Sequence, residues 1–320
     1  MIRSAYIRNF RSLRDVELTL EPLTVLVGPN SSGKTTILRA LQPTQGFRTE
    51  DHWQQDSSLQ IQLELRYDDG GINIQGPRRS SLMQVAGGAI VERRTGQTFD
   101  LRSHLAQLLH LNLGALRNQN VLEAANQLEP DGRNLTNVFA TLTRTQQSAI
   151  AKQLCELVPM FSDVDLQPTE SGRHQLRFQD RWKPELWFSP NQVSDGTMLV
   201  LAFLVLQYQN PPVDLILIEE PERALHPYLL EAVISLMRRM TTGEIGKKPV
   251  QIVLATHSAE FLEHLRPEEV RFLSRSPEDG SVKVNQADTS SANWQRAYAA
   301  YQKSLGGVWL SGSMGGVPGT

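Results

Sequence analysis

Residues Thr24–Thr36 read TVLVGPNSSGKTT, and this stretch decides the fold. Its segment Gly28–Thr35 matches the phosphate-binding pattern G-x-x-x-x-G-K-[ST] at every fixed position. An apolar run from Leu23 to Val27 predicts a buried strand before the segment, and the residues after Lys34 predict a helix. A strand, a glycine-bearing turn and a helix N-terminus direct backbone N–H groups at one point. We therefore predict a nucleoside triphosphate site, against the alternative of an ordinary Gly-Ser turn.

The residues of this loop have different expected roles. Lys34 places a positive charge near the β- and γ-phosphates, which also makes it a candidate catalytic residue. The Thr35 hydroxyl is a candidate ligand of Mg²⁺. The backbone of the loop is expected to surround the phosphate oxygens. The predicted nucleotide-binding residues of the loop are Gly28, Pro29, Asn30, Ser31, Ser32, Gly33, Lys34, Thr35 and Thr36.

Length and composition are those of an ordinary globular protein. The chain has 320 residues and a formal net charge of −2, so it has no overall excess of positive charge that would indicate nucleic acid binding. The longest apolar run, Met198 to Leu206, is too short to span a membrane and predicts a buried helix. Because the N-terminus lacks the apolar core of a signal peptide, we expect a cytoplasmic protein without a membrane partner. Cys155, the single cysteine, excludes an intrachain disulfide and is expected to be a buried helix residue.

Hydrophobic periodicity predicts an α/β protein. Residues 1–100 contain alternating patterns typical of strands, and residues 190–285 alternate between strand and helix patterns, so together they are expected to form a nucleotide-binding core. Residues 101–189 are predicted to form an inserted, mainly helical lobe, and residues 286–320 a C-terminal tail. The helical patterns of the lobe cover Leu101 to Leu111, Val121 to Leu128, Leu135 to Leu142 and Ile150 to Phe161.

A second apolar strand, predicted over Val213 to Ile218, ends in two adjacent carboxylates, Glu219 and Glu220. Ligands of open α/β sheets lie at the carboxyl ends of the strands. A cation and a water explain why two acids are adjacent there, with Glu219 as a ligand of Mg²⁺ and Glu220 polarising the water that attacks the γ-phosphate. The alternative is that both acids begin an exposed helix after Pro221.

Two further segments carry candidate site residues. Val193 to Thr197 opens a predicted helix with Ser194 and Gly196, whose hydroxyl and N–H groups have the chemistry to bind phosphate. Taken alone, this pattern is better explained by an ordinary helix N-cap. His257 follows a strand predicted over residues 250–255, which places it at the same sheet edge, where a purely structural histidine is the alternative.

The ordered motifs NFRSL, GPNSSGKTT, VSDGTM, LILIEEPERALHP and ATHS resemble those of ABC-type ATPases in the RecF, SMC and OLD-related branch, found in DNA repair and anti-phage systems. The resemblance covers essentially the whole chain. It implies a single P-loop NTPase head of the ABC type, with a mixed sheet core, an antiparallel β lobe and the inserted helical lobe. It also implies that two heads enclose two ATP molecules, each held by the phosphate loop of one subunit and the signature motif of the other.

The resemblance assigns expected roles to single residues. Ser194 and Gly196 would contact the γ-phosphate of the nucleotide bound to the partner copy. Glu220 would be the catalytic base, and His257 the switch that senses the γ-phosphate. Arg11, in NFRS, matches a family position that reaches the nucleotide.

The sequence departs from the family pattern at four points. The signature reads SDG in place of SGG, and the first acid is Glu219 in place of Asp; both departures are common in the OLD-related branch. His226 stands where many members have Asp. The glutamine that binds Mg²⁺ in the family has no clear counterpart, and Gln75 and Gln84 are the candidates.

The function implied by the resemblance is an ATP-binding and ATP-hydrolysing subunit that dimerises head-to-tail and acts as a conformational switch in DNA repair or anti-phage defence. OLD proteins carry a C-terminal Toprim nuclease, whereas the residues after His257 show scattered acids and no acidic triad. We therefore expect a separate effector, such as a nuclease or a toxin.

Two other functions use the same loop. The ATPase subunit of an ABC transporter is disfavoured by the NFRSL start, the EEPE motif and the helical insert. A small-molecule kinase leaves Ser194, Glu220 and His257 unexplained together. Nucleic acid is a further candidate partner, although the basic residues of the lobe are equally well explained as a solvated surface. These basic residues are Arg78, Arg79, Arg93, Arg94, Arg173, Arg177, Arg181 and Lys183.

Overall fold

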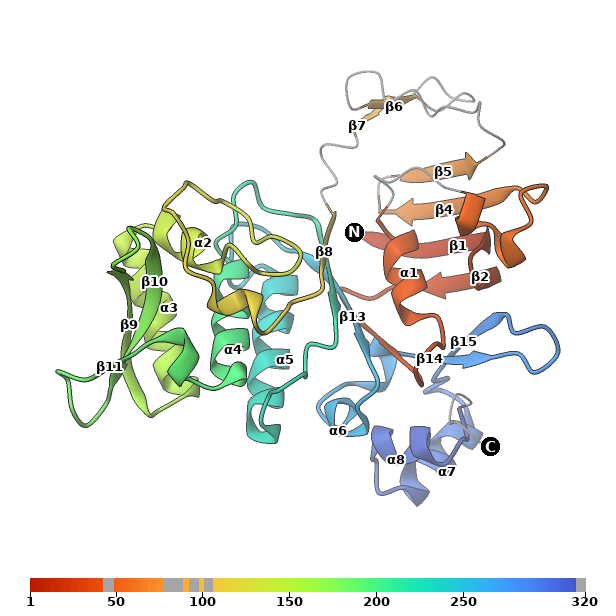
Figure 1. Ribbon diagram of the computed structural model, residues 1–320. Coiled ribbons are helices and arrows are strands. Elements are labelled where there is room, and N and C mark those ends of the chain that lie inside the picture. Colours follow the sequence, from red (N-terminus) through yellow and green to blue (C-terminus); the bar gives the residue numbers. More distant parts are fainter. Residues whose placement is uncertain (43–48, 69, 77–88, 92–97, 101–105, 315–320) are drawn as a thin grey trace. The chain divides into compact units, whose positions relative to one another are not determined.

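The computed structural model describes residues 1–42, 49–68, 70–76, 89–91, 98–100 and 106–314 (Figure 1). The chain forms two compact units. The first consists of Met1–Leu108, Asp214–Pro221 and Val250–Thr320, and the second of Leu109–Val213 and Glu222–Pro249. The domain boundaries expected from the sequence stay a prediction.

A six-stranded mixed sheet is the centre of the first unit. Its strand order is β15-β14-β3-β13-β12-β8. The neighbours β14, β3, β13 and β12 are parallel, and β15 is antiparallel to β14. All five residues of β3 are buried, as expected for a strand covered on both faces. The strands are β3 (Leu23–Val27), β8 (Ala106–Leu109), β12 (Leu215–Glu219), β13 (Gln251–Thr256), β14 (Val270–Arg275) and β15 (Val282–Gln286).

An antiparallel sheet of order β2-β1-β4-β5 forms the predicted β lobe of the first unit. Buried residues of this sheet, of the central sheet and of helix α1 (Lys34–Ala40) form one hydrophobic cluster. The strands are β1 (Ile2–Phe10), β2 (Leu13–Thr19), β4 (Ile61–Tyr67) and β5 (Gly70–Gly76), and a separate pair is formed by β6 (Ala89–Val91) and β7 (Thr98–Asp100). The predicted α/β fold with a mixed core sheet is thus confirmed.

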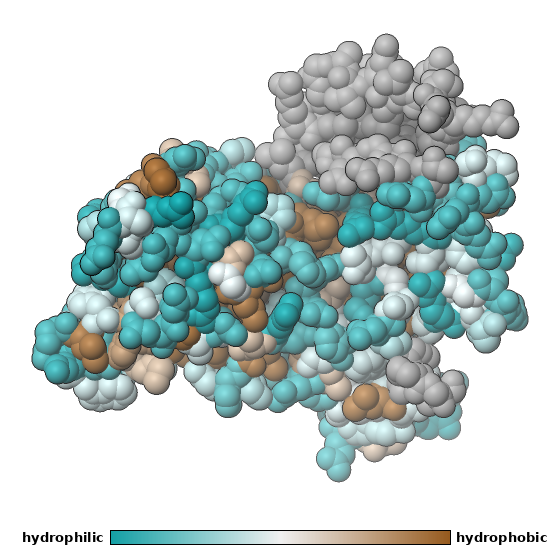
Figure 2. Space-filling view, in the orientation of Figure 1, coloured by the Kyte–Doolittle hydropathy of each residue, from teal (hydrophilic) through white to brown (hydrophobic). Residues whose placement is uncertain are grey.

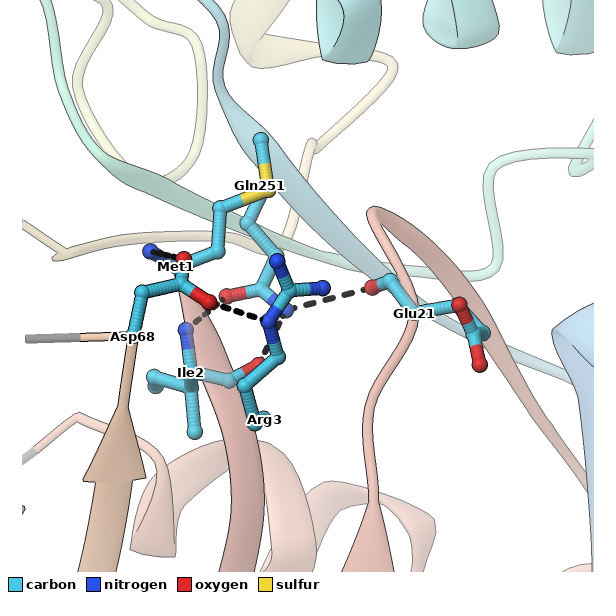
Figure 3. A network of polar contacts seen from close by, with 6 residues as sticks. All are labelled: Met1, Ile2, Arg3, Glu21, Asp68 and Gln251. Carbon is cyan, nitrogen blue, oxygen red and sulfur yellow. Dashed lines mark hydrogen bonds and ion pairs between the residues drawn. The ribbon is translucent and has the colours of Figure 1, made fainter.

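Gln251, the first residue of β13, ties the two sheets of the first unit together (Figure 3). Its Oε1 accepts a hydrogen bond from the Ile2 amide at 2.8 Å. Its Nε2 donates to the Ile2 carbonyl at 2.8 Å and to the Glu21 carbonyl at 3.1 Å. The side chain is fully buried, so water does not replace these partners.

We expect Gln251→Met to lower the free energy of unfolding by about 2 kcal/mol, because buried backbone groups of Ile2 lose their partners. Urea denaturation measures this loss. Gln286→Met is the matched control, since Gln286 accepts only an exposed bond from Thr19 at 2.8 Å, and it should cost less than about 0.5 kcal/mol. Equal losses in the two variants would contradict a structural role of the buried amide.

The second unit combines four helices with a three-stranded antiparallel sheet of order β11-β10-β9. Helix α4 is buried on all sides from Gly196 to Leu206 and packs against α2 and α3, which makes it the central helix of this unit. The elements are α2 (Leu135–Thr141), α3 (Arg144–Leu157), β9 (Phe161–Pro168), β10 (His174–Asp180), β11 (Trp187–Phe188), α4 (Asp195–Leu206) and α5 (Pro227–Thr242).

Two helical patterns of the predicted insert are wrong. The described part of Leu101 to Leu111 contains strand β8, where pairing at the edge of the central sheet overrides the spacing of the leucines. Val121 to Leu128 forms no helix, and two of its apolar side chains, Val121 and Leu122, are exposed by 58% and 45%. The other two patterns correspond to α2 and α3, although α3 ends at Leu157 and Phe161 begins β9.

The C-terminal segment contains two helices, α7 (Ala292–Ala300) and α8 (Leu305–Leu310). Helix α8 packs against α6 (Ala259–Leu262), and a Cβ atom on Gly306 would lie 2.5 Å from the Ala259 carbonyl oxygen. Glu263 accepts hydrogen bonds from the Gly306 amide at 2.9 Å and from the Ser304 hydroxyl at 2.6 Å. The segment is therefore held to α6 by a close backbone contact.

Hydrophilic residues cover most of the face seen in Figure 2, with small separate hydrophobic patches. The exposed apolar side chains of the second unit include Met160, Trp182 and Leu186. Among the described residues, no helix has the length and apolar character needed to cross a membrane.

Cys155 lies on α3, where partial burial raises the pKa of its thiol to about 11. The thiolate is the nucleophile, so at pH 8 we expect iodoacetamide to modify the native thiol about 100-fold more slowly than the thiol of the unfolded chain. The native rate should rise about tenfold per pH unit up to the raised pKa. Equal rates in native buffer and in guanidinium chloride would contradict the raised pKa.

Candidate nucleotide-binding site

The register of the central sheet brings three of the predicted motifs to one edge. Val27, at the end of β3, lies opposite Thr256 of β13, and Ala255 of β13 lies opposite Glu219 of β12. All three strands are parallel, so the phosphate loop, the acidic pair and His257 follow their carboxyl ends side by side. This juxtaposition is the one predicted from the strand patterns.

Two glycines of the loop occupy positions where a side chain does not fit. A Cβ atom on Gly28 would lie 2.6 Å from the Ser32 hydroxyl and 2.7 Å from the Leu273 carbonyl oxygen. Gly33 has φ of +105°, and its Cβ would lie 2.5 Å from Val282. The loop therefore requires glycine at both fixed positions of the motif.

Lys34 begins α1 and folds back over its own loop. Its Nζ donates to the carbonyl oxygens of Gly28 at 2.7 Å and Pro29 at 2.9 Å. A phosphate group is a stronger acceptor for an ammonium group than a carbonyl, so a bound nucleotide would compete for this side chain. Thr35 follows on the exposed side of the helix N-terminus.

The residues at this edge fit a magnesium ion. Mg²⁺ bound with a nucleotide usually takes one or two protein oxygens and completes its shell with phosphate and water. The Thr35 hydroxyl, at the N-terminus of α1, and the Glu219 carboxylate, at the end of β12, are oxygen donors of this kind. Gln75 lies in β5 opposite Gln62, and Gln84 lies outside the described residues, so neither is placed as a third ligand.

Glu220 and His257 form a direct pair. The Glu220 carboxylate oxygen lies 3.2 Å from Nδ1 of His257. Glu220 leaves the strand with φ of +49°, and its amide donates to the Ala255 carbonyl at 2.8 Å, which fixes this turn. The two side chains are exposed by 38% and 49%, so both remain accessible to water and ligands.

Ser194 lies in the second unit, where it caps the N-terminus of α4. Its hydroxyl accepts a hydrogen bond from the Thr197 amide at 3.1 Å, which confirms the ordinary N-cap. The residue is exposed. Position 196 requires glycine because the Ala224 backbone approaches it closely: a Cβ atom there would lie 2.7 Å from the Ala224 carbonyl oxygen.

Asp195, the residue that makes the signature SDG, has a partner of opposite charge. Nη2 of Arg117 lies 2.6 Å from the Asp195 carboxylate and donates to the Val193 carbonyl at 3.0 Å. The Arg117 side chain is only 16% exposed. The carboxylate beside Ser194 is therefore paired within its own unit.

The side chain of Arg11 is held by Asp51. Its Nε donates to the Asp51 carboxylate at 2.7 Å, and its amide donates to the Asp51 carbonyl at 2.6 Å. The neighbouring Ser12 adjoins the phosphate loop, since its hydroxyl lies 3.5 Å from the position of a Cβ on Gly33. A contact between Arg11 and the nucleotide stays a prediction.

Comparison with known proteins identifies the family. A family model described as "AAA domain, putative AbiEii toxin, Type IV TA system" matches residues 99–263, just over half of the chain. The chain belongs to this family. A second model, described as "AAA ATPase domain", matches residues 1–74 and includes the phosphate loop of this AAA-domain protein.

Two curated proteins are similar in sequence to this AAA-domain protein. The OLD nuclease of Thermus scotoductus is 25% identical over 340 residues, which cover 88% of this chain and 63% of the relative. The chain thus spans less than two thirds of that nuclease. The DNA replication and repair protein RecF of a Synechococcus strain is 48% identical over 42 residues, or 13% of this chain and 11% of the relative.

Solved structures support the fold. An SMC head bound to the C-winged helix domain of ScpA has a TM-score of 0.55 at 16% identity, covering 91% of this chain and 99% of that chain. The SMC head domain from Thermotoga maritima has a TM-score of 0.51 at 13% identity, covering 90% and 99%. The AAA-domain protein therefore has the fold of an ABC-type ATPase head, and its sequence is distantly related to that of the OLD nuclease.

Sequence reasoning missed two arginines of this AAA-domain protein. Arg117 binds Asp195, and Arg275 of β14 binds the carbonyl of Ser31 in the phosphate loop. Neither arginine lies in a motif, and each is far from its partner along the chain. The only sign of such a contact in the sequence was Asp195, the unusual acid in SDG. A carboxylate in a phosphate-binding segment is expected to have a cation nearby that offsets its negative charge.

Proposed function

We propose that the protein binds and hydrolyses ATP with Mg²⁺, dimerises head-to-tail around the nucleotide, and acts as a conformational switch for a separate effector in DNA repair or anti-phage defence. The observation that carries the proposal is the shared sheet edge, where Gly28–Thr35, Glu219 and the pair of Glu220 and His257 follow neighbouring parallel strands. A triphosphate site, a metal ligand and a base are the parts that phosphoryl transfer to water needs.

Each residue of the edge has a part in the proposed reaction. The loop amides and Lys34 hold the β- and γ-phosphates, and Thr35 with Glu219 would hold Mg²⁺, which would supply positive charge beside the phosphate oxygens. The Glu220 carboxylate orients the attacking water and accepts its proton. His257, at 3.2 Å from Glu220, orients this carboxylate and contacts the γ-phosphate.

The second half of the proposed site comes from another copy of the chain. Ser194, which is exposed, and Gly196, which is buried, lie at the N-terminus of a twelve-residue helix, whose amides and positive dipole end suit the γ-phosphate. The pairing of Asp195 with Arg117 supports this role, because it offsets the negative charge that would otherwise repel a phosphate. ATP thus joins two protomers, and hydrolysis separates them.

The proposed effector is a different protein, with nuclease and toxin as the candidate classes. The relationship to an OLD nuclease and the toxin–antitoxin description of the family support this context. A two-state dimer can bias such an effector, since ATP binds the closed state better than the open state.

Mixing two inactive variants tests the composite site. Lys34→Ala removes the phosphate charge of one loop, and Ser194→Asp keeps an N-cap residue while repelling the γ-phosphate. Each variant alone should lack ATP turnover. An equal mixture should regain about a quarter of the wild-type rate, because half of the dimers are mixed and each has one intact site. No regain in the mixture would contradict a site shared between two copies.

A further inference from the structure

Arg275 joins the tip of the phosphate loop to the neighbouring hairpin. Strand β14 runs beside β3, with Phe272 opposite Val27, so its last three residues extend past the end of β3 alongside the loop. Nε of Arg275 donates to the Ser31 carbonyl at 2.8 Å, and Nη1 donates to the Gly280 carbonyl at 2.6 Å. One guanidinium group therefore connects the loop with the turn between β14 and β15.

The contact falls on the part of the loop that needs support. Ser31 has φ of +63°, a left-handed conformation that is unfavourable for a residue with a side chain, and it is exposed to solvent. Such a conformation persists where surrounding groups hold it. The Arg275 guanidinium holds the Ser31 carbonyl, and thereby the peptide group that leads into Ser32.

The hairpin turn is a fixed anchor for this contact. The Gly280 amide donates to the Ser276 carbonyl at 2.9 Å, and the Ser276 amide donates to the Ser281 carbonyl at 2.8 Å. The ion pair of Arg14 with Asp279 of the same turn, at 2.6 Å, is exposed and contributes little to holding the turn. The Val282 side chain contacts the loop as well, as its closeness to Gly33 shows.

We propose that Arg275 is a positioning residue that pre-organises the phosphate loop for the triphosphate. The inference rests on the proposed nucleotide site. A loop held in its binding conformation loses less conformational entropy when ligand binds. The two hydrogen bonds of Arg275, which we call the brace, therefore raise the affinity for nucleotide without taking part in the chemical step. The brace acts on any nucleotide whose β-phosphate occupies the loop, ADP as well as ATP. The shape of the guanidinium group is important, because its separate N–H donors reach two carbonyl groups at once.

The test compares Arg275→Met and Arg275→Lys with the wild type. We expect both variants to bind ADP and ATP about fivefold more weakly, with kcat at saturating ATP unchanged within a factor of about two. Arg14→Met is the matched control, since it removes an arginine that contacts Asp279 of the same turn and leaves the Arg275 bonds in place. Its nucleotide affinity should equal that of the wild type.

Three results would overturn the inference: unchanged affinity in Arg275→Met, an equal loss in Arg14→Met, or full recovery in Arg275→Lys, which would show that charge alone matters. Hydrogen exchange of the ligand-free protein tests the brace without nucleotide. Peptides covering residues 28–35 should exchange faster in Arg275→Met than in Arg14→Met, and equal exchange contradicts the proposal. If the wild-type protein shows no ATP turnover or no dimerisation, this result would instead count against the proposed function, because neither measurement depends on the brace.

Discussion

Glu220→Gln is expected to lower the rate of ATP hydrolysis by about 100-fold or more while ATP remains bound. The amide keeps the shape of the side chain but cannot accept the proton of the attacking water. The backbone turn at φ of +49° and its bond to Ala255 involve no carboxylate, so the fold should be unaffected. Phosphate release measures turnover, and the solution mass with ATP should show a trapped dimer.

The matched control for this variant is Glu268→Gln. Glu268 is an exposed acid in the turn before β14, at the opposite end of that strand from the phosphate loop. Its substitution should leave turnover and mass unchanged. A Glu220→Gln protein with wild-type turnover would remove Glu220 from the chemical step, and a trapped monomer would argue against the shared site.

Lys34→Ala should weaken ATP binding by about 100-fold, since a charge-assisted contact with the phosphates is lost. In the ligand-free protein, Nζ of Lys34 donates to the carbonyl groups of Gly28 and Pro29, and the side chain is partly exposed, so we expect little change in stability. Calorimetric titration with ATP and a thermal melt separate the two effects.

Arg39→Ala provides the comparison within the same helix. Arg39 is an exposed cation in the last turn of α1, away from the loop, and its loss should leave ATP affinity within a factor of about two. If Lys34→Ala and Arg39→Ala bind ATP equally well, the loop is not the triphosphate site.

The central sheet edge could be predicted because its motifs are local. Each of the phosphate loop, the acidic pair and His257 directly follows an apolar strand, and parallel strands bring such positions together. The pairing of Glu220 with His257 at 3.2 Å then depends on side-chain directions, which strand order alone does not determine.

Contacts between distant segments could not be predicted from one sequence. Arg117 and Arg275 look like ordinary surface cations, and only the folded chain shows which carbonyl or carboxylate each one meets. Strand β8 was missed for a related reason: its leucines match a helical spacing, and the open edge of β12 decides the outcome. The sequence predicted a C-terminal tail over residues 286–320, whereas the structure shows that Gly306 is the position that lets α8 approach α6.

That contact joins the C-terminal segment to the helix that follows His257. Helix α6 begins two residues after His257, and at Gly306 no room is left for even one additional carbon atom between α8 and the α6 backbone. Two bodies in such contact slide past one another only by separating, so a small tilt of α6 carries α8 with it. The exposed side chain of Leu310, at the C-terminal end of α8, would then shift together with α6.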